Sequence, residues 1–569
     1  MPILPHMLLT VILKAWPLVL SLVYEVQCSH YLRKFADHWL VRLHEGFDFS
    51  PLEQGCAAFH KGSGKGSAVS HPVPRLVRAV LLKYLNNLSF RQTEAEINLN
   101  LLARWFVGYS WLETPPDHTT LCRFELWLLR HQPHLFFDEV LKQVYQLHPE
   151  ERERLLLSDT FGMYVRGART YTIELLRDLS RHLLAELADL DPTRYQTLLA
   201  ELDQAALFGQ AGDKITPALK PPERAQRLQS VASAALDLHD RLLALLNQSP
   251  FLPPEAEISL RLWLTAIAKV IEDETIVTPD PAQPGGRRIT ERAHGKKGTY
   301  RIACANDLDA TYRDHGKGSA QLQYNAALLS SPHFIHQTQV VTGAAPDPVT
   351  LPTMLQALHE PHDFFPHKVV SDQIYGSGKT RALVHQVSHG QTQLVALLPD
   401  YEKRTDRFVP ADFTLSEDGL SLTCPNGVTS TKIYLKPGAD GDEFRFTHLM
   451  CKNCPFWLSL QQLQQDPSRP HCRPPDGKPN AHRQVFISHH RPFVLAAIEY
   501  NKSDLFKQEM KQRPLIERII FNLTHFFGAR HAKSTGLLKV NFQLRMAAAA
   551  FNLRQLLRLP ARKPALAAA

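Results

Sequence analysis

Three acidic residues stand in local contexts that suit metal-assisted phosphodiester chemistry. Asp159 follows the apolar run 155–158, Asp372 follows the run 368–371, and Glu517 lies in a segment with helical character. Two strand-borne aspartates and one helix-borne glutamate can form a carboxylate cluster for a pair of divalent cations. One cation then activates the attacking oxygen while the other stabilises the leaving oxygen.

Each of these residues also has a simpler interpretation. An aspartate after an apolar strand is often only a turn or cap residue, and a helical glutamate often pairs with a neighbouring base on a solvated face. Two features favour a site. The Gly/Ser-rich loop after Asp372 places its carboxylate at the carboxyl end of a sheet, where ligands bind in open α/β folds. Glu517 is flanked by the apolar pairs 515–516 and 519–520.

Four of the eight cysteines lie in one stretch of the chain, and they are Cys424, Cys451, Cys454 and Cys472. The middle two form a CxxC motif, and four thiolates can hold a tetrahedral zinc ion. The outer spacings are long, so a structural zinc site and an unrelated set of reduced cysteines are equally open, with a redox pair as a third interpretation. His448 and His471 are substitute ligands. The other four cysteines are scattered, which fits a reducing compartment.

The chain has 569 residues, a hydrophobic fraction of 44% and a net charge of +8. This length predicts two to four domains with a substantial core. The basic residues cluster near the C-terminus, which favours a polyanionic partner over a plain solvated helical face. The members of this cluster are Lys507, Lys511, Arg513, Arg518, Arg530, Lys533, Lys539, Arg545 and Arg554.

The first 70 residues predict an N-terminal extension and a linker. The apolar run 7–23 is interrupted by Lys14 and Pro17, so a core helix or an upstream extension is favoured over a membrane span or a signal peptide. The segment 61–67 is rich in Gly, Ser and Lys but follows no strand, so it indicates a linker and not a phosphate-binding loop.

The remaining pattern predicts helices and strands in a definite order. Helical spacing covers 74–84, 90–98 and 101–108, and Asp117 or Thr119 caps another helix. A strand at 154–165 precedes a long helical section, 172–273, and the run 296–300 is expected to be extended. Strands at 321–328 and 334–341, a helix at 348–359 and a strand at 368–371 follow. This order places Asp159 and Asp372 on strands that can lie side by side in a mixed sheet.

The order Asp, strand-Asp-x-x-Tyr-Gly-Ser and Arg-x-x-x-Glu resembles the DDE transposases of bacterial insertion sequences. The closest group has a Tyr-Arg-Glu-Lys signature around the glutamate. The segments 527–537 and 551–557 are similar to the C-terminal end of that family, and the resemblance spans about residues 70–560. Arg513 and Glu517 match the signature, whereas Met510 stands at its tyrosine position and Thr524 at its lysine position.

The resemblance implies an α/β fold with a ribonuclease-H-like mixed-sheet core and two Mg²⁺ or Mn²⁺ ions held by Asp159, Asp372 and Glu517. It implies cleavage at transposon ends and strand transfer into target DNA, by a homodimer bound to terminal inverted repeats in the bacterial cytoplasm, at the nucleoid. DNA contacts are expected from Arg513, Lys511, Arg518, Arg530, His531, Lys533 and Lys539. A DNA-binding relative without catalysis and a metal-dependent nuclease are the alternatives.

The domain organisation follows from these elements. After the extension, residues 71–150 are expected to form a helical DNA-binding domain. The catalytic core is expected in three pieces, 151–171, 275–400 and 491–560, separated by a helical insertion at 172–274 and a Cys-containing insert at 401–490. Residues 561–569 form a tail.

Overall fold

The computed structural model describes most of the chain. Apart from three single positions before residue 30, the described residues are 30–60, 71–110, 112–248, 253–313, 320–399, 407–431, 433–435, 440–466, 469–472 and 482–559. The linker predicted at 61–67, nearly all of the apolar run 7–23, Cys28 and the tail at 561–569 lie outside these ranges.

A series of α-helices precedes the first strand, and these helices pack with the central sheet in one hydrophobic cluster. Side chains cap four of them; for example, Ser89 and Gln92 form a capping box, and Asp117 accepts a hydrogen bond from the Thr120 N–H at 2.7 Å. The cap expected at Asp117 is therefore confirmed. These helices are α2 (Trp39–Gly46), α3 (Ser50–Gly55), α4 (Val73–Leu85), α5 (Phe90–Leu99), α6 (Leu101–Val107), α7 (His118–His131) and α8 (Leu135–Leu147).

The central sheet is mixed and has the strand order β4–β5–β1–β7–β8, with β6 also pairing with β5. Strand β1 is antiparallel to β5 and parallel to β7, and β7 is parallel to β8. Leu157 pairs with Val370, so the strands that carry Asp159 and Asp372 are neighbours, as predicted. The strands are β1 (Leu156–Tyr164), β4 (Thr311–Arg313), β5 (Gln321–Ser330), β6 (Ile335–Thr342), β7 (Lys368–Val370) and β8 (Gln393–Val395).

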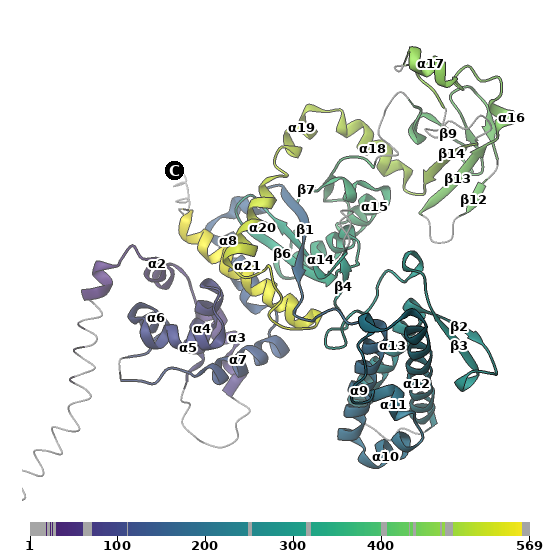
Figure 1. Ribbon diagram of the computed structural model, residues 1–569. Coiled ribbons are helices and arrows are strands. Elements are labelled where there is room, and N and C mark those ends of the chain that lie inside the picture. The colour runs from purple at the N-terminus through teal and green to yellow at the C-terminus, as the bar shows by residue number, and fades with distance from the viewer. Residues whose placement is uncertain are drawn as a thin grey trace, which may run out of the picture.

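Helix α21 (Leu537–Arg558) lies along β6 and also contacts α4 and α8 (Figure 1). Asn541 and Asn552 each bond to both backbone groups of one β6 residue, Val340 and Ile335 respectively. Two amide side chains thus satisfy backbone groups that an unpaired strand would leave open. The other helices around the sheet are α14 (Thr350–His362), α15 (Gly378–Val387), α18 (Arg491–Asn501), α19 (Asp504–Met510) and α20 (Leu515–Phe526).

Residues between β1 and β4 form a helical group with its own hydrophobic cluster (Figure 1). Its elements are α9 (Thr172–Leu190), α10 (Pro192–Ala200), α11 (Gln204–Phe208), α12 (Pro221–Gln248), α13 (Pro254–Glu274), β2 (Thr275–Pro279) and β3 (Arg287–Glu291). The extended run predicted at 296–300 is wrong: a 3₁₀ turn, His294–Lys296, and bends occupy it. Extended structure forms earlier, where the alternating β2–β3 hairpin follows directly from α13.

A third hydrophobic cluster lies between β8 and α18 and gathers Cys472, Cys424 and Cys451 around Phe444 and Phe446. Two three-stranded sheets surround it. Their elements are β9 (Thr414–Leu415), β10 (Leu422–Thr423), β11 (Thr429–Ser430), β12 (Ile433–Leu435), β13 (Gly441–Phe446) and β14 (Arg483–Ser488), with helices α16 (His448–Cys451) and α17 (Leu460–Gln465) beside them.

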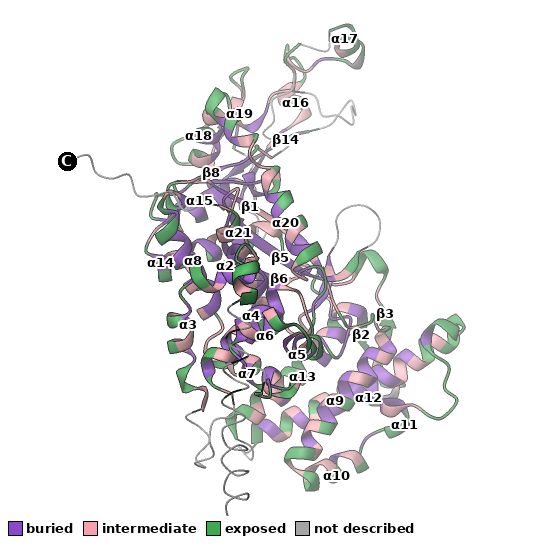
Figure 2. Ribbon diagram, turned by 90° about the vertical axis from the view of Figure 1, so that its left-hand side faces the viewer, coloured by how far each residue is buried: buried purple, intermediate pink, exposed green. Residues whose placement is uncertain are grey.

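Burial is concentrated in the central sheet, whose strands and facing helix sides are covered, while the helical group presents exposed outer faces (Figure 2). The mixed α/β class expected from the sequence is confirmed. Within the described residues, no helix combines the length and apolar character that a membrane span needs.

Candidate active site

Asp159 lies in the middle of β1, opposite Leu328 of β5. Its side chain is 15% exposed, and its Oδ1 accepts a hydrogen bond from the Thr160 N–H at 2.8 Å. Because successive strand residues point to opposite faces, Asp159 shares a face with the buried Leu157 and Phe161. The strand therefore holds a carboxylate at the boundary between core and solvent.

Asp372 lies just beyond the end of β7, two residues after Val370. Its side chain accepts from the Ile374 N–H at 3.0 Å and so caps the short 3₁₀ turn Gln373–Gly376. The buried Arg381 anchors this loop by donating to the carbonyls of Gly376, Leu394 and Ala396 at 3.1, 2.7 and 2.8 Å. A Cβ at Gly376 would lie 1.9 Å from the Leu397 carbonyl oxygen, so only glycine permits this approach.

Glu517 stands in the first turn of α20 and its side chain is 61% exposed. The N-terminal end of a helix favours negative charge. The adjacent Ile516 and Ile519 are buried and hold this end of the helix against the core, leaving the carboxylate at the surface.

Arg513 brings the three carboxylates together. Its Nη2 lies 3.4 Å from Asp159 Oδ2 and 3.9 Å from Asp372 Oδ2, and its Nη1 lies 3.2 Å from Glu517 Oε1. Side chains from a strand, a loop and a helix, spread over more than three hundred residues, thus surround one guanidinium. Three negative charges converging on one positive charge leave a net negative centre that favours further cations.

A fourth carboxylate, Asp347, lies near this group and was missed by sequence reasoning. Its Oδ1 accepts from Asn325 Nδ2 at 2.7 Å and from Arg313 Nη2 at 3.4 Å, and Arg313 also donates to Thr160 Oγ1 at 2.9 Å. The local signal was the Pro-Asp-Pro sequence after a strand, which indicates a turn as readily as a site. Only the packing of β5 against β1 shows that Asp347 faces the Asp159 region.

The pKa of Asp159 is raised to about 6. Burial is the main cause, and the charges of Asp372 and Asp347 add to it, whereas the Thr160 N–H and Arg513 act in the opposite direction. Crowded carboxylates resist ionisation in this way until a cation joins them. A raised pKa from burial and specific charge neighbours is a frequent property of functional sites.

The oxygen donors of Asp159, Asp372 and Glu517 are the type that Mg²⁺ and Mn²⁺ prefer. Within the described ranges, no three His, Cys, Asp or Glu side chains are already gathered in an arrangement that could hold a metal ion. The carboxylates instead face Arg513. The donor chemistry of these carboxylates fits a hard divalent cation. In this structure, the Arg513 guanidinium supplies the positive charge that they surround.

Comparisons with protein families match two parts of the chain. Residues 28–125 match the family described as Transposase domain (DUF772), and residues 423–557 match the family described as Transposase DDE domain. Together the two matches support an insertion-sequence DDE transposase. No curated protein and no solved structure matches it.

The second match includes Glu517 and Arg513 and ends before the C-terminal residues outside the described ranges. Asp159 and Asp372 lie between the two matched regions. The placement of these two aspartates beside Glu517 therefore comes from the tertiary structure.

The two signature departures lie three residues before Arg513 and seven residues after Glu517. Thr524 is buried, and its hydroxyl donates to the Ile520 and Phe521 carbonyls of its own helix at 2.8 and 3.0 Å. Met510 packs against the main hydrophobic cluster. Both side chains therefore stabilise the protein interior, and neither presents a polar group to DNA.

The basic residues expected to contact DNA lie in several places. Lys511 is exposed close to Arg513, and Lys539 is exposed near the start of α21. Arg518 donates to the Pro332 carbonyl at 3.1 Å, and Lys533 donates to Asn87 Oδ1 at 2.8 Å. Arg530 and His531 both lie against the Tyr164 ring, which is five residues beyond Asp159 and so about 17 Å along the strand.

The four cysteines of the insert lie in one neighbourhood. The pKa of Cys451 is raised to about 11 and that of Cys472 to about 12, mainly by burial and to a smaller extent by the neighbouring thiols of the set. Tight turns bring the chain back on itself at two of them: the Gly427 N–H bonds to the Cys424 carbonyl, and the Cys454 N–H bonds to the Cys451 carbonyl. Four soft thiol donors fit zinc chemistry, although no preformed metal arrangement exists among the described side chains.

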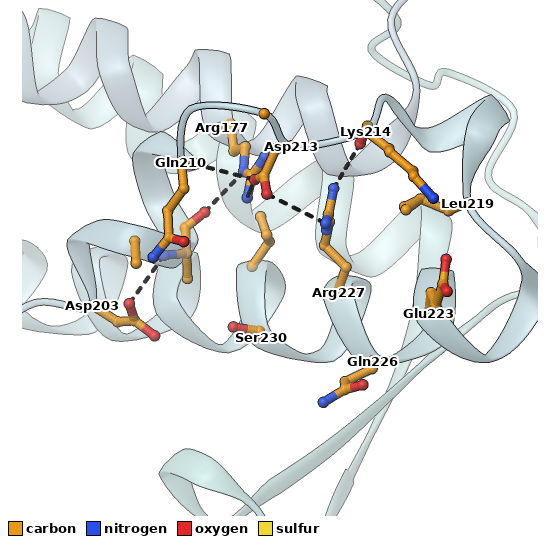
Figure 3. Close-up of a pocket in the computed structure, with 14 residues that line it drawn as sticks. Arg177, Asp203, Gln210, Asp213, Lys214, Leu219, Glu223, Gln226, Arg227 and Ser230 are labelled. Atoms are coloured by element: carbon orange, nitrogen blue, oxygen red, sulfur yellow. Dashed lines mark hydrogen bonds and ion pairs between the residues drawn. The ribbon is translucent and has the colours of Figure 1, made fainter.

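A pocket of about 540 Å³ lies in the helical group, between α9, α11 and α12 (Figure 3). Asp213 stands between Arg177 and Arg227, at 3.1 and 3.4 Å, so one carboxylate pairs with both guanidinium groups. None of the carboxylates around Arg513 lines this pocket. The pocket therefore has no direct part in the chemistry of the carboxylate site.

Proposed function

We propose that this transposase cleaves phosphodiester bonds at the ends of its element and joins the freed 3′-hydroxyl to target DNA. The observation that supports this most strongly is the convergence of Asp159, Asp372 and Glu517 on Arg513. The catalytic core is proposed to be ribonuclease-H-like, because β1 pairs antiparallel with β5, β5 pairs antiparallel with β6, and β7 and β8 continue the sheet in parallel with β1.

Asp159, Asp372 and Glu517 would hold two Mg²⁺ or Mn²⁺ ions. When bound, the ions supply activation of the attacking oxygen and neutralisation of charge on the leaving oxygen. Asp159 releases its proton before it serves as a ligand, since its pKa is raised to about 6. Arg513 is placed to exchange its carboxylate partners for a DNA phosphate, because a guanidinium binds phosphate and carboxylate through the same paired N–H groups.

The test is a cleavage and strand-transfer assay of Asp159→Ala, Asp372→Ala and Glu517→Ala on DNA that carries the ends of the element. Each variant is expected to lose at least a hundredfold in rate, and chelation is expected to abolish wild-type cleavage. Glu499→Ala removes an exposed helical glutamate and is the matched control for Glu517. Retained activity in one variant would remove that residue from the catalytic set.

The products separate the two alternatives. A metal-dependent nuclease gives cut DNA and no joined product. A relative that only binds DNA gives a mobility shift and no cleavage with either metal; the apolar or buried character of Met510 and Thr524 favours this alternative. The active species is proposed to be a homodimer on two inverted repeats, which light scattering of the DNA complex measures directly.

We also propose a structural zinc ion held by Cys424, Cys451, Cys454 and Cys472. Purified protein is expected to contain one zinc per chain, and Cys454→Ser is expected to lose it. Cys122→Ser changes a half-buried cysteine outside the insert and is the control. A wild-type protein without zinc after purification under reducing conditions would exclude this site.

A further inference from the structure

A groove of about 370 Å³ opens where the N-terminal helices meet the C-terminal helices. Three elements supply its polar walls: α2 with Arg42, α21 with Arg554 and Arg558, and α20 with Asn522. Its remaining lining is largely aromatic and aliphatic. No aspartate or glutamate lines it.

Among the residues that the structure describes, no carboxylate pairs with these three arginines. Arg554 lies over the Trp39 ring at 3.4 Å and donates to the Leu85 carbonyl and to Asn86 Oδ1 at 3.4 and 3.2 Å. Arg42 donates to the Leu557 carbonyl. None of the ion pairs found in the described residues includes Arg42, Arg554 or Arg558. Neutral acceptors orient Arg42 and Arg554 and leave their charges uncompensated.

Repulsion between arginines of this groove contributes to a lowered pKa. The pKa of Arg554 is lowered to about 10, first by burial and then by the charge of Arg558. Clustered like charges cost free energy that an anionic ligand recovers. Because the three cations lie on two separate helices and face one groove, an extended polyanion satisfies them better than a single small anion does.

Helix α20 connects this groove with the carboxylate site. Glu517 lies in its first turn and Phe526 is its last residue, nine positions later, which corresponds to about 14 Å along the axis. Phe521 and Phe526 are 51% and 61% exposed, and the Phe521 ring stacks on His525 with centroids 3.9 Å apart. Residues 517, 521 and 525 share one helix face. This length of about 14 Å spans about four phosphates of one DNA strand, at about 3.4 Å per phosphate.

We propose that this arginine groove binds the phosphates of a DNA strand that runs from the carboxylate site along α20. The exposed rings of α20 offer stacking surfaces to bases of that strand where they are unpaired. The groove is built partly from α2, so the bound strand also joins the N-terminal helices to the catalytic side of the molecule. This inference rests on the proposed function, since it takes DNA as the ligand.

The test measures the salt dependence of binding to a fluorescein-labelled DNA duplex, without divalent metal so that no cleavage occurs. Each lost phosphate contact is expected to reduce the slope of log K against log salt by about 0.9. Arg558→Gln, which changes an exposed side chain, is expected to reduce the slope by about 1, and Arg42→Gln combined with it by about 2. Arg558→Lys is expected to retain the slope, because it keeps the charge.

Arg288→Gln removes an exposed arginine on β3 and is expected to leave the slope unchanged. Circular dichroism verifies that each variant is folded. Arg42→Gln is also measured alone, as a second single variant of the groove. Wild-type slopes in both groove variants would overturn the groove proposal while leaving the transposase proposal intact. A wild-type protein that fails to bind DNA would overturn both.

Discussion

Replacing Asp159 with asparagine is expected to stabilise the protein while it abolishes cleavage. The wild-type carboxylate is ionised at pH 7.5 in a place where burial and the charges of Asp372 and Asp347 oppose ionisation. Asparagine has nearly the same shape and carries no charge. The variant therefore loses a metal ligand and also loses an unfavourable charge.

The size of the effect follows from the pKa. Folding raises it from 3.8 to about 6, and a difference of roughly two pKa units corresponds to about 3 kcal/mol. This difference already includes the opposing effects of Arg513 and the Thr160 N–H. The net gain in unfolding free energy is therefore expected to be about 3 kcal/mol at pH 7.5.

The pH dependence has a definite direction. Between about pH 4 and pH 6 the folded protein holds a proton on Asp159 that the unfolded chain has released, so wild-type stability falls as pH rises through this window. The variant lacks this dependence at position 159. The gain in unfolding free energy of Asp159→Asn over wild type is expected to be complete above about pH 6 and to shrink as the pH is lowered toward 4.

Scanning calorimetry of both proteins at pH 4.5 and pH 7.5 measures the difference, with metal-dependent cleavage assayed in parallel. Asp363→Asn changes an exposed aspartate in a left-handed helix cap, where asparagine is equally suited, and is the control. The reasoning is refuted if Asp159→Asn is less stable than wild type at pH 7.5, or if the gap is the same at both pH values.

Three further substitutions test residues that position or stabilise the elements around the site. Arg513→Ala removes a charge that lowers the pKa of Asp159, so the acid limb of the cleavage pH profile is expected to move to higher pH; an unmoved limb in a folded variant would show that Asp159 does not set it. Arg381→Met leaves three buried carbonyls without their donor and is expected to cost about 3 kcal/mol in urea unfolding, with loss of cleavage through the Asp372 loop. Asn552→Leu leaves both backbone groups of Ile335 unpaired and is expected to cost about 2–4 kcal/mol, whereas the exposed Asn98→Ala is expected to change stability by less than about 0.5 kcal/mol.

Local patterns in the sequence predicted most elements of the sheet and the helices beside it. The apolar runs before Asp159 and Asp372 read correctly as strands, because alternating or continuous burial leaves a direct trace in residue type. The same patterns did not locate the β2–β3 hairpin, which is largely exposed and carries little apolar signal.

The meeting of the carboxylates was decided by tertiary structure. Glu517 and Asp159 share Arg513 as a partner because α20 packs against β1, and no local pattern in either segment encodes that packing. Asp347 and the triple pairing of Arg513 likewise depend on side chains from separate elements. Residue types and their order determined which groups were available for chemistry, whereas long-range packing across two large insertions decided which of them share one electrostatic environment.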